Sequence, residues 1–443
     1  MDLIAAFSVF TIVLVFCISR NVTILLPLLV GLFCFTLLGL HRGFKLKALL
    51  LMMKNGVFKS LIVLRIFILI GLITALWRAC GTIPFLVYYG VGFITPSTFV
   101  LFAFVISSML SFAMGTSFGV ASTVGVVLMT LARSGGADVN IVAGAVISGA
   151  YFGDRCAPTS SSANLVAALT GTKLQKNIRV MLVNAFIPFL LSAFVYFLLS
   201  KIHPLSTVNN AFLNEIPAHF NLSAWALIPV VLVLALPLLK CGIQTAMLSS
   251  IVSAAILCFF LQKLSLYDVF TASVFGYKMA SSGPFAQSIA GGGLLTMVKV
   301  SLIIIISSTY SGIFDGTGLL RDLQAAVSRL SGKIGQFPAT VLTSVVTAVC
   351  FCNQTLCIIM TNQLMSQVYE EKNKSKAKLA SDLEDSSVLI AALIPWNTAI
   401  VVPMGTLSVD FRAIPFAVFL YLVPLVCLFT KPVTDKYLGV RLK

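Results

Sequence analysis

Residues 140–171 read NIVAGAVISGAYFGDRCAPTSSSANLVAALTG, two apolar stretches separated by a run rich in polar residues. Pro158 stands between the two stretches, and four hydroxyl side chains follow it directly. Proline removes one backbone donor and clashes with the preceding turn, so it leaves carbonyl groups free. We therefore predict a helix that is broken near its middle, with hydroxyl groups gathered at the break.

The composition places this segment in a lipid bilayer. Of the 443 residues, 59% are hydrophobic and only 10% are charged, and the mean hydropathy is +1.04. Such a chain is too apolar for a soluble domain. Its unbroken apolar runs last about 16 to 22 residues, close to the roughly 20 that cross about 30 Å of hydrocarbon as a helix and too long for membrane β-strands. We expect an integral membrane protein built only of α-helices.

A second copy of the pattern lies 237 positions further along the chain. The stretches 56–165 and 293–402 carry the same succession of apolar segments and loops, and Gly56 aligns with Gly293, Ser107 with Ser344 and Pro158 with Pro395. Apolar chains with an internal repeat are commonly secondary transporters, in which the substrate site lies between the two repeats.

The predicted architecture is two inverted repeats, each with five crossing helices, a hairpin and a broken helix. In the first repeat we expect helices at 3–19, 22–40 and 61–79, a two-part element at 97–133, the broken helix at 140–171 and a helix at 177–199. In the second we expect 225–240, 243–262, 294–314, 337–369, 384–408 and 412–430, with an insertion at 281–292. Each two-part element returns to its starting side, so each repeat makes an odd number of net crossings and the repeats must be inverted. The corresponding domains are 1–200, an external linker at 201–223, and 224–443.

The distribution of positive charge predicts the orientation in the membrane. If the chain starts in the cytoplasm, 20 of the 30 Lys and Arg residues fall in the predicted inner loops and the C-terminal tail, and six fall at the outer side. This asymmetry favours cytoplasmic termini. It also explains the net charge of +16 by orientation and contact with anionic lipid, without nucleic acid. We expect the mixed run 370–378 to be a solvated cytoplasmic loop.

Four places break the helical pattern at membrane depth. The hairpins turn at Gly115-Thr116-Ser117 and at Cys352-Asn353-Gln354-Thr355, and the broken helices are interrupted at Pro158-Thr159-Ser160-Ser161-Ser162, followed by Asn164, and at Pro395-Trp396-Asn397-Thr398. Backbone freed in hydrocarbon must line a cavity or be satisfied by protein. Carbonyl and side-chain oxygens suit a dehydrated Na⁺, and the N-termini of half-helices suit an anionic group. The alternative is that the hydroxyls bond back to their own helix and the prolines merely kink it.

Few ionisable residues lie inside the predicted membrane segments. Asp154 precedes the first break, and a carboxylate at that depth is a functional candidate by default. The alternative is a structural pair of Asp154 with Arg155 or another basic residue. Asp385, beside Glu384 and Asp382, is equally compatible with a plain carboxylate at the start of a helix near the interface. The cysteine and histidine spacings form neither a zinc site nor a metalloprotease motif.

These segments resemble those of the NhaC-type sodium/proton antiporters. The resemblance rests on 149–155 (GAYFGDR) with Pro158 and Asn164, on 384–386 (EDS), on 393–398 (LIPWNT), and on 115–119 (GTSFG) and 81–84 (GTIP). It runs through almost the whole chain. It implies cation/proton exchange on a fold with inverted repeats, hairpins and broken helices, and some relatives exchange organic acids.

One position departs from the family. Family members commonly read Pro-Leu-Ser-Asp-Thr-Thr-Asn where this chain reads PTSSSAN at 158–164, so Ser161 replaces a carboxylate. A cation/proton exchanger needs a group for which the two ions compete. Here Asp154 and Asp385 are the carboxylates that remain for that role, with Arg155 beside them.

We expect an alternating-access transporter of the cell inner (plasma) membrane, with Na⁺/H⁺ exchange as the leading activity. The alternative is a Na⁺- or H⁺-coupled transporter of a small organic solute, an amino acid or a carboxylate, whose anionic group would meet Arg155 or the half-helix N-termini. A channel would need a continuous polar path, and an enzyme would need a nucleophile and base that the sequence does not show. We expect no cofactor beyond the transported ions, and a homodimer is compatible with the sequence.

Overall fold

The computed structural model describes residues 2–20, 23, 25–90, 95–204, 210–239, 241–279, 289–317, 329 and 331–437. All the elements named in this part of the chain are helical, and its one isolated β-bridge pairs Tyr277 with Gly291. The predicted all-α class is confirmed.

The helices of the first half follow the predicted order. They are α1 (Asp2–Ser19), α2 (Leu25–His41), α3 (Leu46–Ala79), α4 (Thr82–Gly90), η2 (Pro96–Thr98), α5 (Phe99–Met114), α6 (Ser117–Val120), the π-helical turn η3 (Ala121–Gly125), α7 (Val126–Ser134), α8 (Val139–Cys156), α9 (Ser161–Thr170) and α10 (Leu174–Ile202). The predicted two-part element corresponds to α5 to α7, and the predicted broken helix to α8 and α9.

The second half continues from α11 (Asn210–His219). It contains η4 (Ala224–Leu227), α12 (Ile228–Leu238), α13 (Ile243–Phe260), α14 (Leu266–Phe275), η5 (Leu294–Met297), α16 (Val298–Thr317), α18 (Gln336–Phe351), α19 (Gln354–Glu371), α20 (Lys376–Glu384), α21 (Ser387–Ile390), η6 (Ala391–Leu393), α22 (Thr398–Leu407), η7 (Phe411–Phe416) and α23 (Val418–Tyr437).

Helix boundaries repeat with the period of the sequence. Shifting α5 by 237 positions gives the bounds of α18, shifting α9 gives α22, and shifting α8 gives the span of α20, α21 and η6. The backbone conformation at the breaks repeats too, since Gly115 and Cys352 both have a positive φ, of 71° and 53°. The breaks are therefore features of the local sequence that formed twice.

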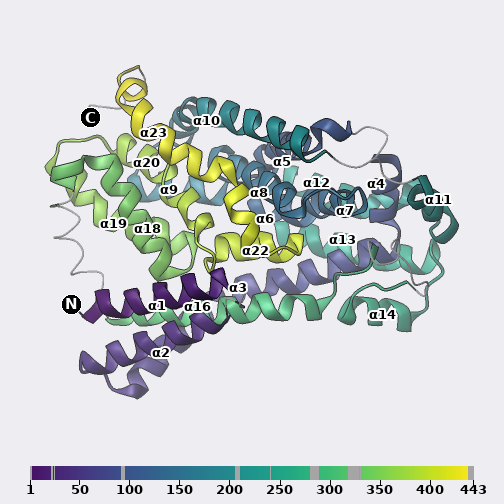
Figure 1. Ribbon diagram of the computed structural model, residues 1–443, viewed down its shortest axis with the longest axis horizontal. Coiled ribbons are helices and arrows are strands. Elements are labelled where there is room, and N and C mark those ends of the chain that lie inside the picture. Colours follow the sequence, from purple (N-terminus) through teal and green to yellow (C-terminus); the bar gives the residue numbers. More distant parts are fainter. Residues whose placement is uncertain are drawn as a thin grey trace.

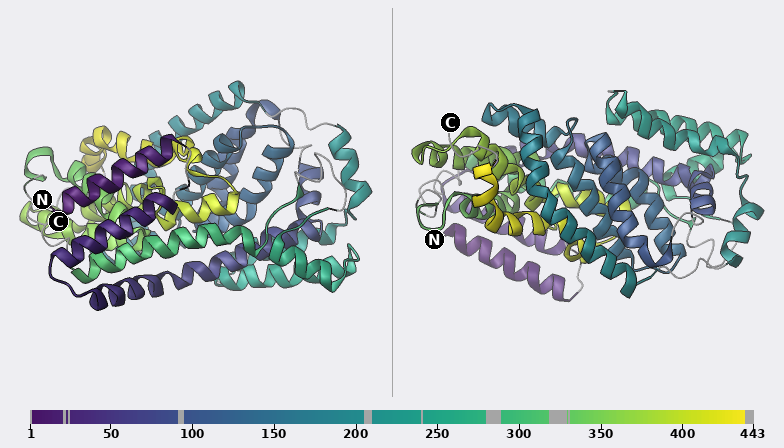
Figure 2. Two further views of the ribbon diagram at one scale, coloured as in Figure 1. Left: turned by 60° about the horizontal axis from the view of Figure 1, so that its bottom comes forward. Right: turned by 90° about the horizontal axis from the view of Figure 1, so that it is seen from above.

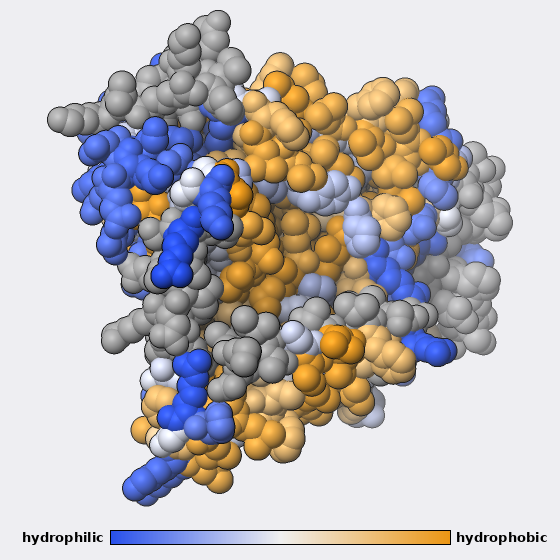
Figure 3. Space-filling model, turned by 60° about the vertical axis from the view of Figure 1, so that its left-hand side comes forward, coloured by the Kyte–Doolittle hydropathy of each residue, from blue (hydrophilic) through white to orange (hydrophobic). Residues whose placement is uncertain are grey.

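The outer surface is that of a membrane protein. Figure 3 shows an apolar band between hydrophilic ends, and the start of α1 and the end of α23 lie at the same end of the molecule (Figure 1). On α10, Phe186, Leu190 and Phe194 are 63%, 52% and 58% exposed, and they recur every fourth residue, so they form one apolar stripe that suits lipid.

Several helices are long and apolar enough to cross a bilayer. In the described part of the chain, four helices meet this condition, or up to six if each of two bent pairs is one span. The bent pairs turn by 63° between 79 and 82 and by 53° between 393 and 398. The predicted count of ten crossings stays a prediction.

Close helix crossings rely on small residues. The helices α1, α2, α3 and α16 lie side by side in one layer (Figure 2). Within that layer, a Cβ on Gly56 of α3 would overlap the backbone of Ser308 and Gly312 on α16, and on α8 a Cβ at Gly153 would overlap the backbone of Ser111 on α5. Small residues let membrane helices approach closely. The helix that carries Asp154 is thereby fixed against the first arm of the hairpin.

Some boundaries differ from the predictions. The helix α3 begins at Leu46 rather than at 61, and its 34 residues span about 51 Å, so most of the predicted inner loop 41–60 is a helix that extends beyond the hydrocarbon. The second broken helix begins at 376 rather than 384, and α11 lies inside the predicted linker. In each case polar residues at a helix end weakened the hydropathy signal without ending the helix. The predicted insertion lies mostly outside the described residues.

We expect Gly153→Ala to lower the melting temperature of the purified protein, because the new methyl group has no room against Ser111 and overpacking typically costs about 1–3 kcal/mol. Gly332→Ala is the matched control, since no atom of the described residues lies within 4 Å of its added Cβ. Equal melting temperatures for the two variants would contradict the close α5–α8 contact.

Candidate functional site

The first hairpin tip packs directly on the first helix break. After α5 ends, Gly115 adopts the left-handed conformation, and the side chain of Thr116 accepts a hydrogen bond from the Gly119 amide at the start of the second arm. A Cβ on Gly115 would overlap Thr159 and Ser160. Glycine is thus required here both by its positive φ and by the close approach of the break.

The second tip meets its own break in the same way. The Thr398 amide donates to the Cys352 carbonyl at 2.9 Å. Side chains of the break complete the contact, because the Asn397 amide donates to Ala348 and the Trp396 indole to Val349, each at 3.1 Å. Trp396 and Asn397, which were predicted at this break, therefore donate hydrogen bonds to backbone carbonyl groups of the hairpin.

The two halves of the molecule meet at the breaks. The Tyr151 hydroxyl of α8 donates to the Ala399 carbonyl of α22 at 2.5 Å. The Gln354 amide, at the second tip, donates to Asp154 Oδ2 at 3.3 Å and to the Val388 carbonyl at 3.0 Å. Asp154 thus lies where one hairpin tip and both broken helices come together.

Asp154 is held by uncharged groups. Its residue is 5% exposed, and the backbone amide of Ser117, at the start of α6, faces its carboxylate. The Asp154 carbonyl accepts hydrogen bonds from the Ser160 and Ser162 hydroxyls, the latter at 2.6 Å. Among the residues that the structure describes, no cationic side chain forms an ion pair with Asp154. The alternative of an Asp154–Arg155 pair is wrong, since consecutive side chains on a helix point about 100° apart.

Not every predicted binding residue gathers around Asp154. Thr159, Ser161, Asn164 and Thr355 are exposed at the surface, as is Pro158. The Asn164 side chain donates to the Ser160 carbonyl at 2.6 Å, so it bonds back to its own chain segment. The two breaks also differ in access, because Trp396, Asn397 and Thr398 are buried.

Arg155 joins the two broken helices. It is fully buried, and its guanidinium pairs with Asp385 and donates to the Met181 carbonyl of α10 at 3.2 Å. Asp385 also accepts from Asn184 at 2.7 Å and lies 2.8 Å from the Lys431 ammonium of α23. The alternative that Asp385 is a plain carboxylate at the start of a helix is wrong, because Asp385 follows the end of α20 and is fully buried, where cations and an amide satisfy it.

The ion-pair network extends to Asp382. This carboxylate pairs with Lys431, lies 3.2 Å from the Lys378 ammonium and accepts from Tyr369. Lys431 also lies over the Phe337 ring, 4.2 Å from its centroid. Lys378 is buried inside α20, so the prediction that 370–378 is a solvated loop is wrong at that end. Sequence reasoning missed Lys431, although a lysine in the apolar run of α23 was a signal.

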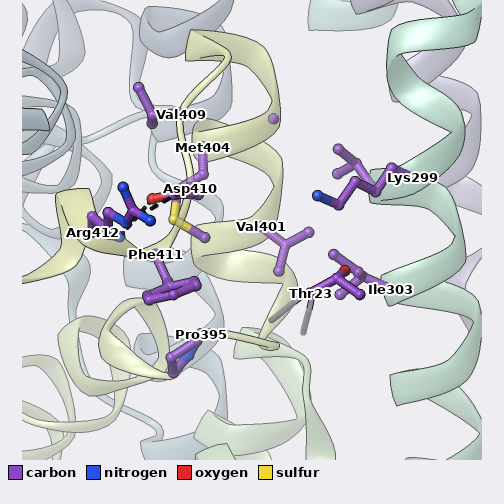
Figure 4. A pocket seen from close by; sticks show the side chains of 12 residues that line it. Thr23, Lys299, Ile303, Pro395, Val401, Met404, Val409, Asp410, Phe411 and Arg412 are labelled. Carbon is purple, nitrogen blue, oxygen red and sulfur yellow. Dashed lines mark hydrogen bonds and ion pairs between the residues drawn. The ribbon is translucent and has the colours of Figure 1, made fainter. Parts of the chain in front are cut away.

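A separate pocket of about 260 Å³ reaches the second break (Figure 4). Pro395 lies at one end of it, Lys299 extends from α16 on one side, and Asp410 and Arg412 form an ion pair of 3.8 Å on the other. Apolar side chains of α16, α22 and η7 complete the lining. The pocket combines positive charge with apolar walls, a combination that suits a small organic anion.

Comparisons with known proteins agree with this geometry. The model of the Na⁺/H⁺ antiporter family matches residues 149–430, which include both breaks of the broken helices. The chain is 32% identical to the Na⁺/H⁺ antiporter NhaC of Bacillus subtilis, over 84% of this chain and 83% of the relative. It is 30% identical to an uncharacterized Na⁺/H⁺ antiporter of Haemophilus influenzae, over 79% and 78%, and 25% identical to a malate-2H⁺/Na⁺-lactate antiporter of Bacillus subtilis, over 94% and 90%.

We expect Asp385→Asn to destabilise the protein strongly, because it leaves Arg155 and Lys431 buried beside a neutral group, and breaking a buried ion pair typically costs about 3–5 kcal/mol. Asp410→Asn is the matched control. Its ion pair with Arg412 is half exposed, and such pairs contribute about 0–1 kcal/mol. Thermal unfolding in detergent measures both, and an Asp385→Asn protein as stable as Asp410→Asn would contradict the assigned network.

Proposed function

We propose that this chain, a secondary transporter that belongs to the Na⁺/H⁺ antiporter family, exchanges Na⁺ for protons and binds Na⁺ at Asp154. One observation carries the proposal. Asp154 is a buried carboxylate without a cationic partner in the described chain, at the contact between the two halves.

The chemistry of the site supports a monovalent cation. A carboxylate in a dry environment favours binding of a cation, because neutral hydrogen-bond donors stabilise it without neutralising its charge. The neighbouring Ser117, Ser160 and Ser162 supply hydroxyl oxygens, and oxygen atoms are the ligands that hard cations prefer. Because a proton and Na⁺ both neutralise the same buried group of charges, binding of one opposes binding of the other. Mutual exclusion of this kind is what couples the two ions in an exchanger.

The architecture supports alternating access. We infer that the two halves are inverted repeats, as domains 1–200 and 224–443 joined by the external linker 201–223, with both termini in the cytoplasm and the chain in the inner membrane. The repeating helix bounds and the position of both chain ends at one end of the molecule support this inference. The exposed first break and the buried second break are consistent with a site that opens to one side at a time.

We expect Asp154→Asn to abolish Na⁺-driven proton movement in proteoliposomes and to remove stabilisation of the purified protein by Na⁺. The amide keeps the shape of the side chain and loses its charge. Ligand at about 100 times its dissociation constant stabilises a protein by about 2.7 kcal/mol, which a melting curve resolves.

Asp138→Asn is the matched control. It lies on the same helix at an exposed N-cap, where Asn caps as well as Asp does. If Asp154→Asn is folded and transports as well as this control, Asp154 is a structural residue and the proposal fails.

A second candidate function is transport of a small organic anion coupled to Na⁺ or H⁺. The pocket between Lys299 and the Asp410–Arg412 pair favours it, because it places positive charge beside apolar walls at the second break. The similarity to a malate-2H⁺/Na⁺-lactate antiporter is compatible with it.

Proteoliposome uptake of lactate and of malate tests this candidate. If an anion is carried, we expect Lys299→Gln to weaken its apparent affinity roughly tenfold, equivalent to about 1.4 kcal/mol. Lys201→Gln, outside the pocket, leaves it unchanged. Absence of uptake would leave Na⁺/H⁺ exchange as the only candidate. Uptake with equal affinities in the two variants would show that the anion does not bind in this pocket.

A further inference from the structure

Glu384 is a buried carboxyl group that the ion-pair network does not use. It is the last residue of α20 and is 0% exposed, and in the described chain neither of its side-chain oxygens has a hydrogen-bond partner. The other three glutamates, at 215, 370 and 371, are exposed. Leaving a buried polar group unpaired is costly, so the position calls for an explanation.

In the described chain Arg155 has hydrogen-bond donors without an acceptor, as Glu384 has acceptors without a donor. Its Nη2 donates to Asp385 and Met181, whereas its Nε and Nη1 are buried and have no hydrogen-bond partner among the described residues. Arg155 pairs with Asp385, the residue that follows Glu384 in the chain. Unused donors and an unused acceptor therefore belong to the same dry cluster.

Counting charges shows what the cluster lacks. The buried cations of this cluster are Arg155, Lys378 and Lys431, and its buried carboxyl groups are Asp154, Asp382, Glu384 and Asp385. Three positive charges against four negative ones leave one negative charge unmatched. A single monovalent cation, either H⁺ or Na⁺, makes the cluster neutral, and neutrality is strongly favoured where water is excluded.

We propose that Glu384 carries the proton that Na⁺ displaces when it binds at Asp154. Protonated Glu384 is neutral and stands apart from Arg155. When Na⁺ arrives at Asp154, the Glu384 O–H bond breaks, the proton passes to water, and the carboxylate pairs with Nε and Nη1 of Arg155. The charge of the cluster is the same before and after. This inference rests on the proposed function, in which Asp154 binds Na⁺.

Other polar groups of the same buried cluster already have partners in the described chain. Asp385 adjoins Glu384 in the chain and pairs with Arg155, and Asp154, on α8 with Cys156, accepts from Gln354. From α23, Lys431 is paired with both Asp382 and Asp385, and from α19, Tyr369 donates to Asp382. On α10, Asn184 is bound to Asp385. Glu384 is the carboxyl group of the cluster with neither an ion pair nor a hydrogen bond in the described chain.

The test measures Na⁺ binding and proton release together. The full-length protein in detergent is titrated with NaCl, with choline chloride as the reference, by calorimetry and with a pH dye in weak buffer. We expect the unmodified protein to release up to about one proton per Na⁺ bound and to bind Na⁺ more weakly as the pH falls. Glu384→Gln fixes this position in its neutral form, so by the same charge count it binds Na⁺ more weakly than the unmodified protein at high pH, it releases no proton, and its affinity does not change with pH.

Glu371→Gln is the matched control, because this exposed glutamate bonds only with Gln367 in the same helix among the contacts of the described chain, and it should behave like the unmodified protein. Proton release by Glu384→Gln equal to that of the control overturns the proposal. So does a Na⁺ affinity of folded Glu384→Gln at high pH that equals that of the control, which would show that the charge of Glu384 takes no part in Na⁺ binding. Failure of the underlying function is a different result, namely Na⁺ binding that survives Asp154→Asn.

An infrared measurement on the unmodified protein keeps the proposal testable if Glu384→Gln does not fold. Adding Na⁺ should remove a protonated carboxyl band, and glutamate labelled with ¹³C at the side-chain carboxyl should shift that band. Since the other three glutamates are exposed, the shift would report Glu384. A band that glutamate labelling leaves in place, or no band at all, overturns the proposal.

Discussion

The buried ion pair between Arg155 and Asp385 is the interaction on which the rest of the site depends. It joins the broken helix of one half to that of the other, 230 positions apart in the chain, and both side chains are fully buried. Charges without water must be paired, because desolvation otherwise costs several kcal/mol for each ion. With Arg155 directed to Asp385, the neighbouring Asp154 has no cation among the described residues. The pair therefore holds the halves together and leaves Asp154, the Na⁺ site that we propose, without a cationic partner among those residues.

The hairpin tips take part in hydrogen bonds that lipid cannot provide. Each tip closes against the break of its own half, and at the second break Trp396 and Asn397 donate to carbonyl groups of the hairpin. At the first break the Asp154 carbonyl, four residues before Pro158, accepts from the Ser160 and Ser162 hydroxyls, so protein groups replace the water that lipid excludes. The Asp154 carboxylate then faces the first amide of a hairpin arm, where the helix dipole favours negative charge. An unpaired carboxylate can persist at that position because neutral donors stabilise it without neutralising it.

Local features of the fold were predictable from the sequence. The lengths of the apolar runs predicted most helices, and the prolines predicted the breaks. The 237-residue repeat predicted that α5 and α18 correspond. Asp154 was predictable as a candidate because an intramembrane carboxylate is rare. The partners of Arg155 and Lys431 were not, because they depend on the direction of side chains on helices distant in sequence. The exposure of Ser161 and Asn164 depended in the same way on packing, and Glu384 is unusual only through contacts that it does not make.

The most direct test of the account is proton movement in proteoliposomes that contain only the unmodified protein, Na⁺ salts and a trapped pH dye. Imposing a Na⁺ gradient with no organic acid present should drive protons across the membrane in the opposite direction, and dissipating the gradient should stop them. Proton movement that requires an added organic anion, or no movement at all while Na⁺ still binds, would contradict Na⁺/H⁺ exchange at Asp154.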